Sequence, residues 1–222
     1  MSLSTGMGVS YSSLMTTSRH QIPVAAIIAA PADSLCLDFV NTRYWRGSAA
    51  PTDELTGFQP LHSWLKAKGG HQEKTLDAVD VWAAKAPAKA GELFGEAIAL
   101  REIVHRLFAA AASEASLPAA DFAALNAMLA IAPSRGRLAS PDAGWEVFLQ
   151  GVSTPALLAP VLWSAAELLL SRKDRRIRQC ANEKCRFLFI DESKNGTRRW
   201  CDMSSCGNRA KAHRHLMKKK QA

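Results

Sequence analysis

The chain has 222 residues, of which 48% are hydrophobic, and its formal net charge is +8. This length and composition fit one medium globular domain, or one such domain with a small appendage. A membrane-spanning helix is not expected, because no run approaches the roughly 18–20 continuous apolar residues that a bilayer requires.

The N-terminal segment, residues 1–22, is rich in Ser, Thr, Met and Gly and shows no periodic apolar face. We predict a disordered leader there. The apolar run 24–30 behind Arg19 and His20 faintly resembles a secretory signal, but it is short and lacks a basic start. Five cysteines, four of them close together, favour a reducing compartment over a secreted disulfide protein. The expected localisation is therefore cytoplasmic.

The next segments carry most of the apolar residues. Residues 34–42, Ser-Leu-Cys-Leu-Asp-Phe-Val-Asn-Thr, are compatible with either a strand or a helix, and Cys36 within them is expected to be buried and free. Between residues 60 and 131 apolar side chains recur every three or four positions, and Gly or Pro separates the segments. The predicted helices cover residues 61–68, 74–86, 88–115 and 118–130.

The pattern changes after residue 136. Residues 137–149 predict a short β-hairpin, because two segments of strand composition flank a Pro-Asp-Ala-Gly sequence. Thr154 and Pro155 suit the N-cap and first position of a helix that continues to Leu169. That helix runs into a basic segment without a Gly- or Pro-rich linker.

Taken together, these segments predict a mainly α fold. A helical N-terminal domain with a short β-hairpin covers residues 23–172, and a small C-terminal unit covers residues 173–222.

The C-terminal unit contains four regularly spaced cysteines. They form two pairs with equal four-residue gaps, separated by fifteen residues, and four thiolates satisfy a tetrahedral structural Zn²⁺ with no open position. Two disulfides, an iron–sulfur cluster, or His213 and His215 as substitute ligands are less favoured alternatives. We predict one structural zinc ion. Its ligands are Cys180, Cys185, Cys201 and Cys206.

The residues around the cysteines predict a small finger. Residues 186–190 have strand composition, Asn195-Gly196 is a preferred turn dipeptide, and residues 197–200 can return as a second strand. A basic helix capped by Ser204 or Ser205 follows. This order is that of a treble-clef-like zinc finger. So small a unit has little core, so loss of zinc should unfold the finger and leave the helical domain largely intact.

Two motifs resemble known families. Residues 198–211, Arg-Arg-Trp-Cys-Asp-Met-Ser-Ser-Cys-Gly-Asn-Arg-Ala-Lys, resemble the CGNR zinc finger family, which takes its name from the tetrapeptide at residues 206–209. Residues 37–42, Leu-Asp-Phe-Val-Asn-Thr, are similar to the opening motif of the ABATE domain, a helical domain that often precedes this finger. The resemblance implies a bacterial transcription regulator that responds to stress, without a demonstrated DNA target.

The charge distribution adds a physical argument for nucleic acid as the partner. Residues 171–222 carry 16 Lys and Arg against 5 Asp and Glu, whereas residues 1–170 carry 12 against 15. A basic unit on a nearly neutral body is typical of polyanion-binding proteins. We predict DNA binding, with base contacts from Asn208 or Arg209. The candidate nucleic-acid-binding residues are Arg198, Arg199, Asn208, Arg209, Lys211, Arg214 and Lys218.

A second hypothesis assigns a small-molecule effector to the helical domain, which would gate the finger. The alternative function is a protein-interaction finger attached to such a sensor. No phosphate-binding glycine loop, nucleophile elbow or paired carboxylate motif is present, so no enzyme activity is expected. A homodimer is compatible with a regulator, although no coiled-coil pattern predicts one. The candidate ligand-binding residues are Asp38, Asn41, Arg43 and Arg101.

Overall fold

The computed structural model of the chain describes residues 24–140, 144–172, 176–212 and 219. Helices account for about half of it and the sheets are small, so the predicted mainly α fold is confirmed. Nowhere in these ranges is a helix long and apolar enough to cross a membrane. The leader predicted at residues 1–22 lies outside the described residues.

The helices span Leu35–Val40 (α1), Phe58–Lys68 (α2), Glu73–Lys85 (α3), Pro87–Ala112 (α4), Ala119–Ile131 (α5), Thr154–Leu157 (α6) and Ala159–Leu170 (α7), followed by a π-helical turn at Met203–Gly207 (η1). The strands span Val24–Ile28 (β1), Arg43–Tyr44 (β2), Thr52–Asp53 (β3), Arg137–Ser140 (β4), Gly144–Leu149 (β5), Ile177–Gln179 (β6) and Leu188–Ile190 (β7).

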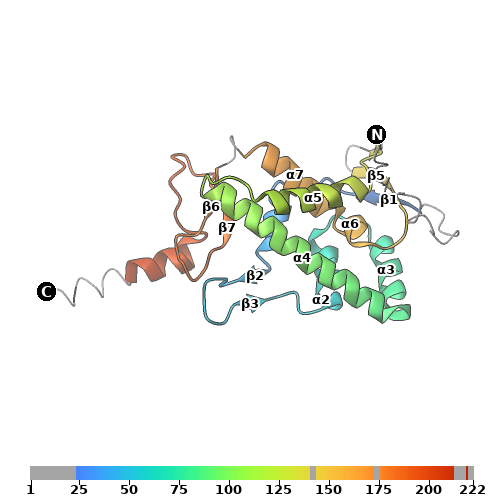
Figure 1. The fold of residues 1–222 in the computed structure, drawn as a ribbon, viewed down its shortest axis with the longest axis horizontal. Helices are drawn as coiled ribbons and strands as arrows, with labels where there is room; N and C mark the ends of the chain where they lie inside the picture. Colours follow the sequence, from blue (N-terminus) through green and yellow to red (C-terminus); the bar gives the residue numbers. More distant parts are fainter. Residues whose placement is uncertain (1–23, 141–143, 173–175, 213–218, 220–222) are drawn as a thin grey trace, which may run out of the picture.

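Helix α4 is the centre of the helical domain (Figure 1). Its apolar residues recur three or four positions apart, which places them in one stripe along the helix. Leu100, Val104 and Leu107 in this stripe are fully buried. Helices α1, α2, α3, α5 and α6 all contact α4. The helices predicted between residues 60 and 131 are thus present, although α2 begins at Phe58, earlier than predicted.

A three-stranded antiparallel sheet lies at the end of the molecule opposite the C-terminal unit (Figure 1). Its order is β1–β5–β4, so the hairpin predicted at residues 137–149 is confirmed. The first strand, β1, was not predicted. It pairs with β5 along its whole length, and this partner is more than 100 residues away in the chain.

The helix predicted to run from Thr154 to Leu169 is interrupted. Ser153, rather than Thr154, is the N-cap, and its hydroxyl accepts a hydrogen bond from the Ala156 N–H at 3.4 Å. The helix stops at Leu158 and resumes as α7. Pro160 explains the interruption, because it has no N–H and its ring would clash with the carbonyl of the residue four positions earlier.

The ambiguous segment 34–42 forms helix α1, and it contacts the C-terminal unit. Asn41 follows α1 and is buried. Its side-chain N–H donates to the Leu188 carbonyl at 2.8 Å, and its side-chain oxygen accepts from the Leu188 N–H at 3.1 Å. One amide side chain therefore pairs with one peptide unit of β7, as a neighbouring strand would.

The C-terminal hairpin also shares the core of the helical domain. Strands β6 and β7 pair antiparallel, and both contact α4 near its C-terminal end (Figure 1). Ile177 and Leu188 from these strands belong to the same buried cluster as the apolar residues of α4. The sequence-based boundary at residue 173 stays a prediction, and the hydrophobic core extends across it.

The loop between β2 and β3 makes a further contact with the C-terminal unit. The Gly47 N–H donates to the Lys184 carbonyl at 3.2 Å. A Cβ at position 47 would lie 1.8 Å from the Glu183 carbonyl oxygen, so only glycine fits this approach.

The Asn41 pairing leads to a stability prediction. Asn41→Leu leaves the buried N–H and C=O of Leu188 without that partner, and an unsatisfied buried group costs about 1–3 kcal/mol. We expect the free energy of unfolding, measured by urea denaturation, to fall by at least this amount. Asn126→Leu on the exposed face of α5 is the matched control. It should change the value by no more than about 0.5 kcal/mol, and equal effects of the two substitutions would contradict the assigned role.

Candidate metal centre and basic surface

The four C-terminal cysteines converge on one point. Cys180 directly follows β6, Cys185 ends the turn before β7, and Cys201 and Cys206 lie before and within η1. Their sulfur atoms all lie within 4.8 Å of one another. The two pairs predicted from their spacing therefore face each other across a single site.

The sulfur positions fit a tetrahedral zinc ion. With Zn–S bonds of about 2.3 Å, the sulfurs of a tetrahedral site lie about 3.8 Å apart. The Sγ atoms of Cys185 and Cys201 are 3.7 Å apart. Because all four ligands come from the protein, no position is open for a water or a substrate, and the ion serves a structural role.

The thiols also need a cation for electrostatic reasons. The hydrogen bond between Cys185 and Cys201 lowers the pKa of Cys185 to about 5 and raises the pKa of Cys201. Burial raises the pKa of Cys180. Within the Cys185–Cys201 pair one thiolate thus forms at the expense of the other. A bound divalent cation favours the thiolate form of every ligand.

Backbone hydrogen bonds shape the first turn. The Cys180 N–H donates to the Phe187 carbonyl at 2.8 Å, and the Cys185 N–H donates to the Asn182 carbonyl at 2.8 Å. The Asn182 side-chain N–H in turn contacts the Cys206 sulfur at 3.5 Å. The first turn thus supplies two ligands and supports a third.

The second turn is capped by Asp202, not by the predicted Ser204 or Ser205. The Asp202 carboxylate accepts from the backbone N–H of Ser204 at 3.0 Å and of Ser205 at 3.1 Å. The Ser204 hydroxyl and these backbone hydrogen bonds lower the pKa of Asp202 to about 2. An aspartate has two acceptor oxygens and a negative charge for the helix N-terminus, so it displaces the serines as cap.

The hairpin of the finger also differs from the prediction. Residues 188–190 are a strand, as expected, but their partner is β6 rather than residues 197–200. The hairpin therefore encloses the first cysteine pair instead of lying between the pairs. A turn is present at the predicted Asn195-Gly196 dipeptide, since the Gly196 N–H donates to the Ser193 carbonyl at 3.0 Å, and Gly196 has φ of 59°. The segment after this turn, residues 197–200, is hydrogen-bonded to the first cysteine turn. The Ala181 N–H donates to the Arg199 carbonyl at 2.8 Å.

The loop between the cysteine pairs is ordered by Asp191. This buried carboxylate accepts from the Ser193 N–H and the Arg198 N–H, both at 3.0 Å. Burial alone would raise its pKa, but the Ser193 hydroxyl, which donates to it at 2.5 Å, and these two backbone N–H groups lower the pKa of Asp191 below its usual value.

Arg198, a candidate nucleic-acid-binding residue, makes contacts within the finger. Its guanidinium donates to the carbonyls of Trp200, at 2.9 Å, and Cys201. It also lies 4.6 Å from the centre of the Phe189 ring. These contacts hold the second cysteine pair, so Arg198 has a structural role whatever else it binds.

The other candidates that the structure describes are exposed to solvent. They are Arg199, Asn208, Arg209 and Lys211. Arg209 lies 4.6 Å from the centre of the Trp45 ring, and Arg199 lies 5.5 Å from the Trp200 ring. Arg214 and Lys218 lie outside the described residues.

Trp45 reaches the finger from the helical domain through an unusual backbone. Its φ is 56°, a left-handed conformation that costs about 1–3 kcal/mol for a residue with a side chain. The ring packs against the apolar cluster formed by the cysteines and Phe189. This packing, with the contact to Arg209, offsets the strain and fixes Arg209 against the helical domain.

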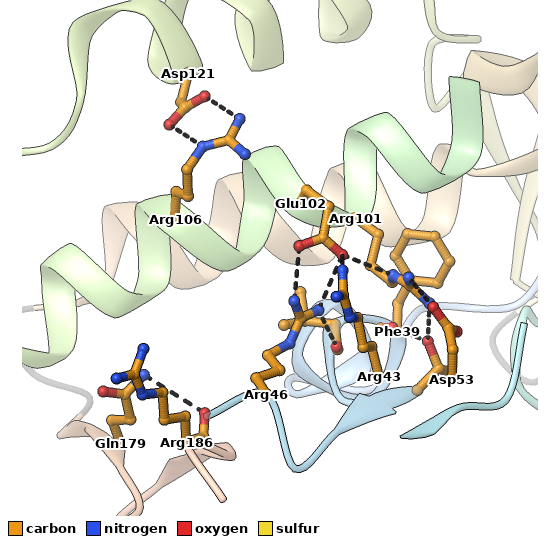
Figure 2. A network of polar contacts seen from close by, with 12 residues as sticks. Phe39, Arg43, Arg46, Asp53, Arg101, Glu102, Arg106, Asp121, Gln179 and Arg186 are labelled. Carbon is orange, nitrogen blue, oxygen red and sulfur yellow. Dashed lines mark hydrogen bonds and ion pairs between the residues drawn. The ribbon is translucent and has the colours of Figure 1, made fainter. Parts of the chain in front are cut away.

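The candidate ligand-binding residues lie in different surroundings. Figure 2 shows Arg43 and Arg101 in one polar network with Glu102. The Arg101 side chain is 1% exposed and donates to both oxygens of Asp53 at 2.6 Å. Asn41 faces Leu188, and Asp38 is exposed. The donors of Arg101 and Asn41 are thus engaged within the protein, and a ligand at these residues stays a prediction.

The charges in this network stabilise one another. Arg46 donates to both carboxylate oxygens of Glu102, at 2.7 and 3.2 Å, and to the Val40 carbonyl at 3.0 Å (Figure 2). Although burial opposes ionisation, Arg101 lowers the pKa of Asp53, and Arg46 lowers the pKa of Glu102. The network joins the segment after α1 to α4.

Several site residues were missed by sequence reasoning. Asp202 carried a signal, because Asp is a preferred N-cap directly before a helix start. Asp191, with Ser two positions later, fits a side-chain-capped turn. No local sequence signal pointed to Trp45 or Asp53, since their roles depend on partners far away in the chain.

Comparison with known families agrees with this geometry. Residues 33–172 match the ABATE family, described as "Putative stress-induced transcription regulator", and residues 176–219 match the CGNR zinc finger. The chain belongs to the ABATE family and carries a C-terminal CGNR zinc finger. Among curated proteins, none matches this sequence.

The zinc site leads to a metal-content prediction. Cys201→Ser replaces one thiolate with a hydroxyl, a poor zinc ligand, and should lower the zinc content of the purified protein well below one ion per chain. Cys36→Ala removes a buried cysteine outside the site and should keep one ion per chain. Elemental analysis of both variants checks this. An unchanged zinc content in Cys201→Ser would contradict the assignment.

Proposed function

We propose that this protein binds DNA through its zinc finger and controls transcription. One observation carries the proposal: the zinc-bound turn presents exposed cations that are free for phosphates. Within the described part of the chain, Arg199, Arg209 and Lys211 form no ion pair with an acidic side chain. Arg199 and Arg209 line the same cleft beside the zinc site, and Lys211 is exposed on the helix that follows. Exposed cations of this kind match the electrostatic term that dominates DNA affinity.

The geometry at the start of the C-terminal helix supports base contacts as well. Residues 208–212 continue η1 as an α-helix, which the Asp202 cap starts at a fixed position. Asn208 and Arg209 lie in its first turn. Both side chains can form bidentate hydrogen bonds with purine edges in the major groove.

The proposed role is one of binding, in the cytoplasm, without a catalytic step. The family description supports transcription control under stress. Gating by an effector and assembly into a homodimer are compatible with this role but are not needed for it. The alternative, a finger that binds protein, predicts a weak response to salt, because an apolar interface releases few counterions.

Salt-dependent binding to random duplex DNA tests the proposal. For the zinc-loaded protein we expect log Kd to rise steeply with log salt concentration. Arg209→Ala and Lys211→Ala should each weaken binding and make the slope shallower by about 0.9 for each phosphate interaction that the substitution removes. Fluorescence anisotropy with a labelled duplex measures both quantities.

Lys85→Ala is the matched control, since it removes the same charge from the exposed end of α3. It should leave affinity and slope nearly unchanged. Zinc content is measured for every variant, so that unfolding of the finger is not mistaken for loss of a DNA contact. No binding at low salt by the zinc-loaded protein would contradict the proposal and favour a protein partner.

A further inference from the structure

A cleft of about 770 Å³ lies beside the zinc site. Its walls come from the first cysteine turn, from the segment before the second pair, and from the start of the C-terminal helix. Glu183, Lys184, Arg199, Trp200, Arg209 and Ala210 line it. This volume is within the range of about 300–1,000 Å³ that small-molecule sites occupy, so it admits a group larger than a phosphate.

The two arginines at the cleft contact aromatic rings. Each arginine guanidinium lies near an indole ring, Arg209 at Trp45 and Arg199 at Trp200. An indole contact restrains the arginine without using its N–H groups in an ion pair. Arginine planes and aromatic rings are the groups on which proteins stack unpaired bases.

The remaining wall residues complement a base better than a phosphate. Ala210, like Ala181 opposite the helix, is small and leaves the space open. Glu183 is an exposed carboxylate that would repel a phosphate but accepts hydrogen bonds from the amino group of a base. Lys184 is exposed on the same turn and can neutralise a phosphate. The cleft therefore combines a carboxylate that can accept hydrogen bonds from a base, planar groups on which a base can stack, and cations that can bind its phosphate.

We propose that this cleft binds one unpaired nucleotide of a nucleic acid strand. The base enters the cleft between the arginines and Glu183, and its phosphate lies toward Lys184 and the helix cations. This inference rests on the proposed function, because it assumes that the finger binds nucleic acid. The inference adds that the protein prefers a nucleic acid in which one base is unpaired and can leave the base stack of the helix.

A steric block tests the cleft without changing its charge. Ala210→Phe fills the space, whereas Ala212→Phe adds the same ring to an exposed position two residues along the helix that does not line the cleft. The zinc-loaded full chain is titrated into three labelled DNAs. They are a paired duplex, the same duplex with one bulged nucleotide, and that duplex with an abasic bulge.

The wild-type protein should bind the bulged duplex about tenfold more tightly than the paired and abasic duplexes, which is the size of one base-stacking contact. Ala210→Phe should abolish this preference and leave binding to the paired duplex unchanged, while Ala212→Phe keeps both. Equal affinity of the wild-type protein for all three DNAs would overturn the cleft proposal. An equal loss of affinity on all three in Ala210→Phe, with zinc retained, would also overturn it.

The outcomes separate the two proposals. If the protein binds the paired duplex without preference for the bulge, the DNA-binding function is supported and the cleft proposal is refuted. Absence of binding to all three DNAs at low salt removes the proposed function itself, and the cleft proposal with it.

Discussion

The pairing of Asn41 with the Leu188 peptide joins the two parts of this molecule. A peptide unit inside a core must find a partner for its N–H and its C=O, because water cannot reach it. Asn41 provides both, from the end of a short helix whose other side packs in the helical core. The β6–β7 hairpin therefore lies between the zinc site and α4, and belongs to both.

This arrangement changes what zinc does. A free-standing finger with four cysteines would fold or unfold with its metal and leave its neighbour unaffected, as the sequence suggested. Here the hairpin places Ile177 and Leu188 in the helical core. The energy of zinc coordination therefore also stabilises the contacts of α1 and α4 with the hairpin. The helical domain also positions Arg209 directly, because Trp45 belongs to that domain and its ring contacts the Arg209 guanidinium. Rigid support of this kind lowers the entropy that binding must overcome.

The sequence was informative wherever structure depends on neighbours in the chain. Helices α2 to α5 followed from apolar spacing, and the zinc ligands followed from the two equal cysteine gaps. It failed where the partner is distant. Strand β1 is five residues whose partner, β5, lies more than 100 residues away. The β6–β7 pairing is local and was missed for another reason, because the Asn195-Gly196 dipeptide favoured the segment after it as the partner of β7. Arg101 and Asn41 were singled out as candidate ligand-binding residues. Their partners, Asp53 and Leu188, could not be found from local pattern.

We infer that the finger hairpin and the helical domain form one cooperative unit. Amide hydrogen exchange of the full chain, with zinc and after its removal, tests this most directly. We expect zinc removal to speed exchange in β6 and β7 and also in α1 and the C-terminal half of α4, while the β1–β5 pairing keeps its protection. Faster exchange confined to the finger, with α1 and α4 unchanged, would contradict it.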